Sequence, residues 1–381
     1  MFGLAAISIL GVAVWLGLSS GGTQAALFGV GVGAGVVLYH ASFGFASSWR
    51  ALVSEGRGEG VRVQMLMLAV TSLVFIPVLA AGEWFGPVRG AVAPLGVSVV
   101  AGAFLFGVGM QLGGGCASGT LYTAGGGNIR MLAVLVAFIA GSVIGAQHQP
   151  FWADTPALPS VSLVERFGPI PALAFTLSAC SAIALLSLAA ERQRNGASDR
   201  EPRAVSWLRG PWPLVAGALG LAVINIATLA ITGRPWGITS AFVLWGSKPL
   251  LALGVDVASW PYWQPEARAA ALRASVWADV TSVMNVGIVL GAFAAATVAK
   301  RLSPTWKVPL PSLAAAILGG LMLGYGARIA YGCNIGAFFS GIASSSLHGW
   351  LWMAAALAGT TLGTRIRPFF GLGASNQGGA R

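Results

Sequence analysis

One stretch of this sequence occurs twice. Residues 102–119 read GAFLFGVGMQLGGGCASG, and residues 319–336 read GGLMLGYGARIAYGCNIG. A shift of 217 positions places Gly115 on Gly332 and Cys116 on Cys333, and it also matches Gly107 with Gly324, Gly109 with Gly326 and Gly119 with Gly336. Two of the chain's three cysteines therefore fall in register. Agreement at a single offset indicates an internal duplication. A functional site is therefore expected where the two copies meet.

The composition of the chain decides its structural class. Hydrophobic residues make up 56% of the sequence and charged residues only 9%. The chain contains several apolar runs of about 20 residues, the length that a helix needs to cross a bilayer. This predicts an all-α polytopic membrane protein. The net charge of +11 resides mainly in loops and tails. No basic face with interleaved aromatic residues accompanies it, so nucleic acid is not an expected partner.

About ten spanning helices are predicted. The apolar start, Met1 to Leu18, lacks a basic leader and is interpreted as the first helix rather than a signal peptide. The helices form two sets of five, in a first repeat at 1–190 and a second at 211–381, joined by a linker at 191–210. Because five is odd, the copies must be inverted in the membrane. The predicted helices are 3–18, 24–40, 62–80, 95–112, 129–147, 168–190, 212–231, 274–298, 311–328 and 348–365.

Four polar or glycine-rich segments lie between these helices and are too short to span. We predict that 40–50, 113–128, 232–250 and 330–346 are re-entrant loops, each with a short half-helix. Irregular backbone at membrane depth is tolerated only where it lines a cavity or is buried in protein. The first loop of each half also aligns, because a shift of 193 places Phe43-Gly44-Phe45 on Trp236-Gly237-Ile238.

The distribution of basic residues predicts the orientation of the chain. If alternate loops share one side, that side collects 15 of the 22 Lys and Arg residues. Since short cytoplasmic loops are enriched in basic residues, both termini and the 191–210 linker are expected to be cytoplasmic, with surface segments at 147–167 and 251–273 outside. The 15 residues are Arg50, Arg57, Arg62, Arg130, the five arginines from 192 to 209, Lys300, Arg301, Lys307, Arg365, Arg367 and Arg381.

Cys116 and Cys333 are the main candidates for contact with a solute. Gly115 and Gly332 allow close approach of the backbone, and the half-helix that follows each cysteine directs free N–H groups toward an anion. A free cysteine has a pKa near 8.5, so each side chain is expected to be a neutral thiol. A thiol donates a weak hydrogen bond, and its polarizable sulfur suits a sulfur-bearing solute. Cys180 lies in an apolar helix and is expected to be structural.

Several polar residues have two possible roles each. Arg234 and Arg328 either supply positive charge to the pathway or contact lipid headgroups. Asn334, like Asn128 and Asn285, either binds solute or satisfies loop backbone. Asp256 and Asp279 either bind a coupling cation or mark helix boundaries. The starts of the first loops add Gly44 and Gly237 as pathway candidates. No cysteine pair or histidine cluster has metal-ligand spacing, so no metal, cofactor or disulfide is expected.

At these residues the chain resembles the YeeE/YedE sulphur-transport family. The resemblance covers about 25–367 and rests on the motifs GGGCASGTLYTAGGGN, GYGARIAYGCNIGAFFSGIASSSLHGW, TGRPWGITSAF and SVWADVTSVMN. It implies an hourglass-shaped protein of the bacterial inner membrane with four inward loops. Thiosulfate would pass through it by successive S–H···S contacts, and a small soluble carrier of the TusA type would work beside it on the cytoplasmic face. Cys116 and Cys333 match two cysteines of the family pattern.

One position departs from that pattern. The family commonly has a cysteine between two aromatic residues in the first loop, whereas this chain has Gly44 between Phe43 and Phe45. A relay of thiols therefore loses one step, which leaves other sulfur oxyanions and selenium compounds open as solutes.

Three functions follow from these features. The first is import of a small sulfur anion, with thiosulfate the leading solute. The second is a membrane sulfurtransferase that forms a persulfide on Cys333 or Cys116 for a soluble carrier. No histidine or carboxylate adjoins either cysteine in sequence to activate it. The third is a channel for small neutral solutes.

Overall fold

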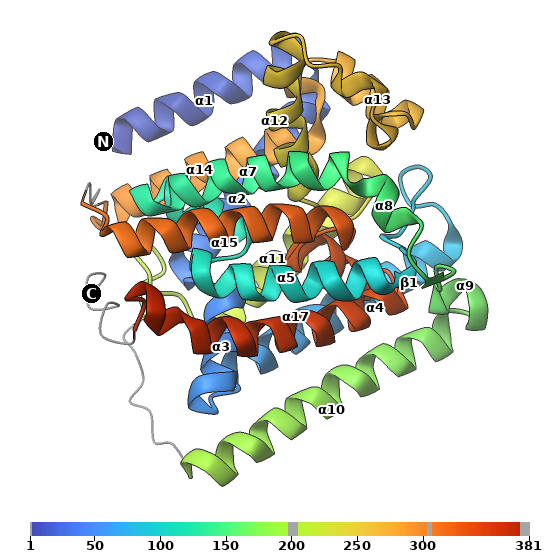
Figure 1. The fold of residues 1–381 in the computed structure, drawn as a ribbon, viewed down its shortest axis with the longest axis vertical. Helices are drawn as coiled ribbons and strands as arrows, with labels where there is room; N and C mark the ends of the chain where they lie inside the picture. Colours follow the sequence, from blue (N-terminus) through green and yellow to red (C-terminus); the bar gives the residue numbers. More distant parts are fainter. Residues whose placement is uncertain (1, 197–204, 303–306, 374–381) are drawn as a thin grey trace.

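The computed structural model describes residues 2–196, 205–302 and 307–373, and it is mostly helical (Figure 1). The prediction of an all-α membrane protein is confirmed. Ten long helices lie in the described ranges, within a few residues of most predicted positions. They are α1 (Phe2–Ser19), α2 (Gly22–Ala41), α4 (Glu59–Ala81), α5 (Val97–Gly113), α7 (Ile129–Gln147), α10 (Pro169–Asn195), α11 (Leu214–Thr232), α14 (Val280–Val298), α15 (Leu310–Ile329) and α17 (Leu347–Ile366).

Eight helical stretches of the described chain are long and apolar enough to cross a membrane. Of the ten long helices, α1 is a shorter apolar helix and α17 is not among the eight. In α17, His348, three threonines and three glycines dilute the apolar residues. The eight stretches are Gly22–Glu55, Glu59–Ala81, Val97–Gly125, Ile129–Gln147, Pro169–Asn195, Leu214–Thr232, Val280–Val298 and Leu310–Ala343.

Each of the four segments predicted to form loops contains short helical structure. They hold α3 (Phe45–Glu55), α6 (Ala117–Gly125), α12 (Thr239–Ala252), and the π-helical turn η4 (Asn334–Phe339) followed by α16 (Ser340–Ala343). These helices pack inside the bundle. The helix α6 contacts α7 and α14, whereas α16 contacts α17 and α4.

The connecting segments carry small elements that the sequence did not predict. The strand β1 (Leu95–Gly96) pairs antiparallel with β2 (Ala157–Leu158), with Leu95 opposite Leu158. The other elements are α8 (Gln149–Ala153), α9 (Leu163–Phe167), η1 (Val257–Ser259), η2 (Pro261–Trp263), α13 (Glu266–Arg273), η3 (Val276–Ala278) and η5 (Arg367–Phe370).

The long helices pack in two similar sets. In one set α15 packs between α5 and α7, and α17 packs on the other side of α5; in the other, α2 packs against α14 and α11, and α11 packs against α4. Glycines allow the closest approaches. A Cβ atom on Gly107 would lie 2.1 Å from the Ala356 carbonyl oxygen, and one on Gly324 would lie 2.1 Å from that of Phe138. The backbones of these helix pairs therefore touch directly.

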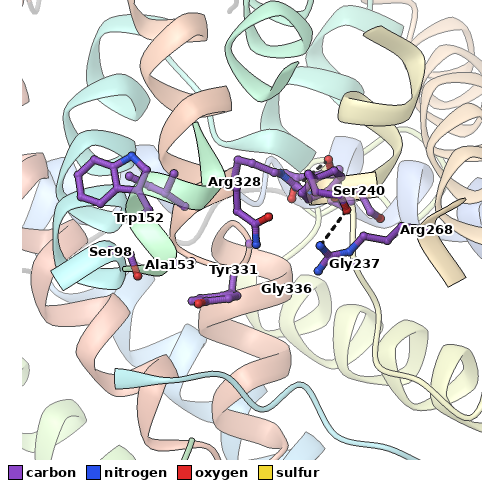
Figure 2. A pocket seen from close by; sticks show the side chains of 15 residues that line it. Ser98, Trp152, Ala153, Gly237, Ser240, Arg268, Arg328, Tyr331 and Gly336 are labelled. Carbon is purple, nitrogen blue, oxygen red and sulfur yellow. Dashed lines mark hydrogen bonds between the residues drawn. The ribbon is translucent and has the colours of Figure 1, made fainter. Parts of the chain in front are cut away.

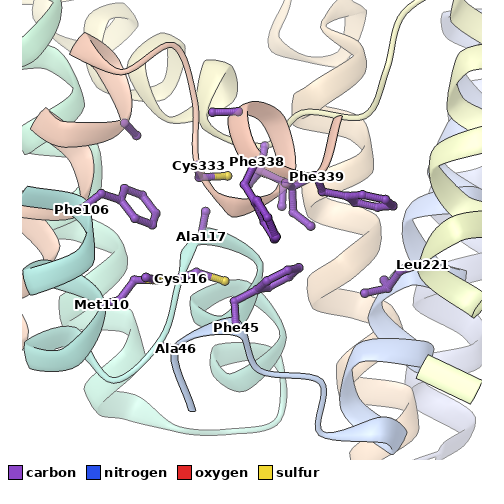
Figure 3. Packing of buried hydrophobic residues seen from close by; sticks show 14 of the residues in the cluster. Phe45, Ala46, Phe106, Met110, Cys116, Ala117, Leu221, Cys333, Phe338 and Phe339 are labelled. Atoms are coloured by element: carbon purple, nitrogen blue, oxygen red, sulfur yellow. The ribbon is translucent and has the colours of Figure 1, made fainter. Parts of the chain in front are cut away.

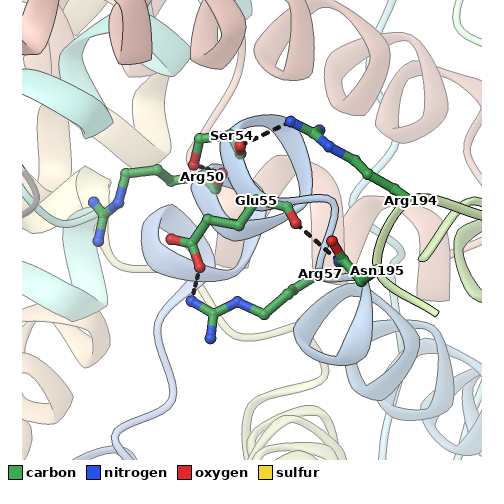
Figure 4. Close-up of polar contacts among 6 residues, drawn as sticks. All are labelled: Arg50, Ser54, Glu55, Arg57, Arg194 and Asn195. Carbon is green, nitrogen blue, oxygen red and sulfur yellow. Dashed lines mark hydrogen bonds and ion pairs between the residues drawn. The ribbon is translucent and has the colours of Figure 1, made fainter. Parts of the chain in front are cut away.

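The helix α10 continues to Asn195, five residues beyond its predicted end, so the start of the predicted linker 191–210 is helical. Polar contacts hold this extension. Glu191 forms an ion pair with Arg62 at 2.6 Å. Arg194 donates to the Ser54 carbonyl at 3.1 Å, and Asn195 donates to the Glu55 carbonyl at 3.0 Å (Figure 4). Residues 197–204 of the predicted linker lie outside the described residues.

Candidate functional site

Cys116 begins the helix α6 and is 2% exposed. Its Sγ accepts a hydrogen bond from the Gly119 N–H at 3.5 Å and lies 3.3 Å from the Ser118 hydroxyl. Its carbonyl accepts from the Thr120 N–H at 2.8 Å, which starts the helix. The sulfur therefore occupies the position of an N-cap side chain, at the end of the helix that favours negative charge.

Cys333 holds the matching position before η4 and is 1% exposed, although its side chain makes no cap hydrogen bond. Its backbone angles, φ −111° and ψ −167°, are close to the φ −86° and ψ −169° of Cys116. Its carbonyl accepts from the Ala337 N–H at 2.8 Å, the counterpart of the Thr120 contact. The two cysteine loops thus have similar geometry as well as similar sequence.

The preceding glycines are needed for this geometry. A Cβ atom on Gly332 would lie 2.8 Å from the Ala337 nitrogen, and Gly332 has φ +148°. A Cβ atom on Gly115 would lie 3.3 Å from the Gly119 carbonyl carbon. In each loop, therefore, the chain before the cysteine folds against the first turn after it, and a side chain would push that turn away.

Both cysteines belong to one buried hydrophobic cluster (Figure 3). Aromatic side chains from several elements belong to it, and the ring centroid of Phe338 lies 6.2 Å from that of Phe45 and 6.5 Å from that of Trp352. Neither cysteine lines the two cavities described below. The thiols are therefore close together in the core but closed off in this conformation.

Asn334 directly follows Cys333 and is fully buried. Neither its Nδ2 nor its Oδ1 has a hydrogen-bond partner among the residues that the structure describes. An unsatisfied buried amide costs about 1 to 3 kcal/mol, so such a side chain marks a place where a polar ligand would be stabilised. Asn285 is half satisfied, because its Nδ2 donates to the Ile238 carbonyl at 3.0 Å while its Oδ1 has no partner. Asn128 caps α7.

A cavity of about 280 Å³ opens next to the Cys333 loop (Figure 2). Its walls include the predicted residues Gly237, Arg328 and Gly332, and it reaches Gly336 in the first turn of η4. The other lining residues are Ser98, Gln149, Trp152, Ala153, Ile238, Thr239, Ser240, Tyr262, Arg268, Ile329 and Tyr331.

Two arginines give this cavity positive charge. Arg328 donates to the Tyr262 hydroxyl, and Arg268 donates to the Tyr262 carbonyl at 3.1 Å. Both guanidinium groups lie over the Tyr262 ring, at 5.1 Å and 4.5 Å from its centroid. Arg328 was a sequence candidate, whereas Arg268 lies in the predicted surface segment 251–273, where no motif singled it out. Together they make the cavity suited to an anion.

A second cavity, of about 630 Å³, adjoins the first and shares Gly237 and Ser240 with it. Arg234 lines it, and within the described ranges only main-chain atoms of Arg234 form hydrogen bonds. Asp279 also lines it and caps α14, accepting from the Ser282 N–H at 2.7 Å. Asp256 accepts from the Ser259 N–H at 3.3 Å. Both aspartates therefore mark element boundaries, the second of the two roles considered above.

Gly44 begins α3 between the rings of Phe43 and Phe45, whose centroids are 5.5 Å apart. A Cβ atom on Gly44 would lie 2.3 Å from the Ser47 hydroxyl. That hydroxyl donates to the Gly44 carbonyl at 3.1 Å. A serine hydroxyl thus stands close to where a side chain at position 44 would begin.

In each half, a side chain from a long helix donates a hydrogen bond to a backbone carbonyl in the short helix of the first loop, α3 or α12. Gln111 donates to the Ala46 carbonyl at 3.1 Å, and Arg328 donates to the Thr239 carbonyl at 3.2 Å. Gln111 and Arg328 are related by the shift of 217, and Ala46 and Thr239 by the shift of 193. The same contact is therefore made twice, once by a neutral and once by a charged side chain.

The remaining cysteine, Cys180, is free and buried in α10. Within 2–196, 205–302 and 307–373, no group of three or more His, Cys, Asp or Glu side chains could hold a metal ion.

The profile of a family described as sulphur transport matches residues 40–362. Among curated proteins, the chain is 32% identical over 161 residues to the probable transporter YedE of Escherichia coli strain K12. The matched region covers 42% of this chain and 39% of the relative. The chain thus spans about two fifths of that relative's length.

Two thiosulfate transporters named TsuA match over longer stretches. The protein from Spirochaeta thermophila is 27% identical over 347 residues, covering 83% of this chain and 91% of the relative. The protein from Escherichia coli strain K12 is 26% identical over 277 residues, covering 69% of this chain and 72% of the relative.

Proposed function

Because this chain belongs to the sulphur transport family, we propose that it imports thiosulfate across a bacterial inner membrane, using Cys116 and Cys333 as neutral hydrogen-bond donors. The chain is a multi-pass membrane protein, and its relatives support a transporter for a sulfur-containing anion. The choice of thiosulfate rests on the two TsuA relatives.

The observation that carries this proposal is the repeated cysteine loop. Each thiol begins a short helix, follows a glycine that cannot carry a side chain without displacing the next turn, and lies in the same buried cluster. Close packing alone does not require a thiol at both positions. A soft terminal sulfur of thiosulfate can accept S–H contacts there, while helix N–H groups face its negative charge.

The route begins at the positively charged cavity. Arg268 and Arg328 attract the dianion to a site beside Gly332 and Gly336, one turn from Cys333. Asn334 then supplies unpaired donor and acceptor atoms next to the first thiol. Passage from Cys333 to Cys116 requires Phe338 and Phe45 to move, because their rings fill the same cluster. At the first loop, Ser47 offers a hydroxyl near Gly44.

We propose further that residues 1–190 and 211–381 are inverted repeats, each with two re-entrant hairpins. Two packing relations support this. In the predicted repeats, α2, α4, α5 and α7 correspond to α11, α14, α15 and α17. Replacing each helix by its counterpart turns the α7–α15 contact into α17–α5 and the α2–α14 contact into α11–α4, and all four contacts are present. The Gln111 and Arg328 contacts are a third example. In this arrangement Arg234 and Gly237 lie on the outer approach to the pathway.

We place both termini and the 191–210 linker in the cytoplasm, where a TusA-like carrier would receive the sulfur anion. The support is the bias of basic residues together with the fold. The start of α1 and the ends of α10, α14 and α17 lie at the same end of the bundle, at the left of Figure 1. The opposite end holds α8, α9 and the β1–β2 pair.

The sulfurtransferase alternative needs a base next to a thiol. The polar groups that contact the Cys116 sulfur are the Ser118 hydroxyl and the Gly119 N–H, and neither is a base. The geometry therefore favours transport over covalent transfer.

Uptake of labelled thiosulfate by a bacterial host that lacks its own importers tests the proposal. Cells expressing the chain are expected to grow on thiosulfate as the sole sulfur source and to accumulate the label. Intact-protein mass spectrometry of the purified protein after uptake should show unmodified cysteines. A persulfide or thiosulfate adduct on Cys116 or Cys333, without accumulation of label, would support the sulfurtransferase instead.

A further inference from the structure

Three arginines from separate elements converge on the last turn of α5. Arg367 of η5 donates to the Gln111 carbonyl at 2.5 Å. Arg130 of α7 donates to the Leu112 and Gly113 carbonyls at 2.6 Å and 2.5 Å. Arg50 of α3 donates to the Gln111 side-chain oxygen at 3.5 Å. We call Arg50, Arg130 and Arg367 the arginine triad.

Capping of α5 explains only part of this arrangement. The C-terminus of a helix carries roughly half a negative charge, which one guanidinium group would balance. The triad brings three positive charges, and no ion pair joins any of them to a carboxylate in the described parts of the chain. Burial, with repulsion from Arg50 and Arg130, lowers the pKa of Arg367 to about 10, so it stays charged at neutral pH. A net positive charge therefore remains.

Two nearby arginines, one in the α3–α4 connection and one in α4, behave differently. Arg57 pairs with Glu55, and Arg62 pairs with Glu191 at 2.6 Å. The chain thus neutralises nearby arginines with its own carboxylates but leaves the triad without one. The residues that the triad contacts, 111–113, directly precede Gly114-Gly115-Cys116, so the triad adjoins the Cys116 loop.

We propose that the arginine triad, with Gln111, forms a binding site for a small oxyanion at the end of the pathway opposite the cavity. Guanidinium groups bind oxyanions through paired N–H groups, and three positive charges match a dianion better than a monoanion. An anion that leaves the Cys116 loop would meet this site next. As the exit of a thiosulfate pathway, the site rests on the function proposed above. As an oxyanion site, it can be tested alone.

Sulfate is the probe, because it has the charge and oxygen atoms of the expected ligand but no terminal sulfur for a thiol. Binding is measured by calorimetry on protein in nanodiscs of zwitterionic lipid, with wild type and with the Cys116→Ala/Cys333→Ala variant. Both should bind sulfate saturably with similar affinity. Failure of thiosulfate transport would leave this result unchanged, so the two proposals fail separately.

Arg50→Gln and Arg367→Gln each remove a charge while keeping a donor for the α5 contacts. Each is expected to weaken sulfate binding by about tenfold or more, because a hydrogen bond to a charged group is lost. Arg57→Gln, at the same end of the bundle but paired with Glu55, is the matched control and should bind like wild type. Arg50 makes the longest contact of the triad, so Arg50→Gln keeps the test valid if Arg367→Gln misfolds.

Anionic lipid headgroups offer the same chemistry as a soluble oxyanion. The titration is therefore repeated in nanodiscs that contain phosphatidylglycerol. Sulfate affinity within about threefold of that in zwitterionic lipid supports a site for solute. Loss of sulfate binding in phosphatidylglycerol would assign the triad to lipid and overturn the proposal, as would unchanged binding in both triad variants or no saturable binding by wild type.

Discussion

Asn334 is the residue at which stability and transport are expected to conflict. Its amide is fully buried and has no partner, one residue from Cys333. Leucine has a similar size and needs no hydrogen bond, so Asn334→Leu should raise the free energy of unfolding by about 1 to 3 kcal/mol. The same change removes polar atoms that we assign to the solute, so thiosulfate flux should fall at least several-fold. Thermal unfolding in detergent and flux in proteoliposomes measure the two effects.

Asn128→Ala serves as the control for this prediction. Asn128 caps α7 with its side chain, and loss of a cap costs about 1 kcal/mol. The variant should be less stable, with normal flux per folded molecule. If Asn334→Leu is destabilised as well and transports normally, Asn334 has only a structural role.

Some site residues could be predicted from the sequence, whereas others come together only when the chain folds. The register of Cys116 and Cys333 is a property of the linear sequence, and so it was visible there. Arg268 reaches its cavity only because α13 folds back toward Tyr262, a contact that no local pattern encodes. The arginine triad was predicted as loop charge, since its members lie far apart in sequence and meet only at the end of α5.

At the scale of elements, Gln111 and Arg328 make equivalent contacts, so we replace Arg328 with the glutamine found at the equivalent position. Arg328→Gln should still donate to the Thr239 carbonyl, as Gln111 does to that of Ala46, so α12 should keep its position. The cavity would lose one of its two positive charges, and thiosulfate KM should rise several-fold with little change in the melting temperature. A large fall in melting temperature, with KM unchanged in the folded fraction, would make Arg328 a purely structural residue.

Two glycines should respond oppositely to alanine. In Gly107→Ala the new Cβ atom would meet the Ala356 carbonyl oxygen at 2.1 Å, so α5 and α17 must separate and the protein should lose about 1 to 3 kcal/mol of stability. Gly29 has no atom near its Cβ position, so Gly29→Ala should be neutral or gain up to about 1 kcal/mol from helix propensity. Denaturation in detergent compares the two. Equal effects would mean that α5 and α17 are not in direct backbone contact.

Helix positions were largely predictable because apolar runs of sufficient length have few alternatives in a membrane. The predicted 129–147 coincides with α7, and 311–328 differs from α15 by one residue at each end. Errors arose where side chains decide the boundary. Helix α14 begins at Val280 rather than 274, since Asp279 caps it. Helix α10 continues to Asn195 because Arg62, Ser54 and Glu55 bind its last turn.

At the scale of the whole molecule, orientation can be tested by labelling single introduced cysteines in intact cells. Gln193→Cys lies on the exposed end of α10, and Ala267→Cys lies on the exposed face of α13. A membrane-impermeant maleimide should label Ala267→Cys but reach Gln193→Cys only after the cells are opened. The three native cysteines are buried, so wild type should give little background. Labelling of Gln193→Cys from outside would reverse the proposed topology.

The central claim is that two buried thiols line a path for thiosulfate, and flux in proteoliposomes tests it most directly. We expect Cys116→Ala and Cys333→Ala to reduce flux strongly, with serine at either position restoring it only in part. A hydroxyl donates well but lacks the polarizability of sulfur, whereas loss of one weak contact of about 1 kcal/mol alone would cost only several-fold. Cys180→Ala should transport like wild type. Full activity in both Cys116→Ala and Cys333→Ala, with flux lost in Cys180→Ala at normal expression, would contradict the account.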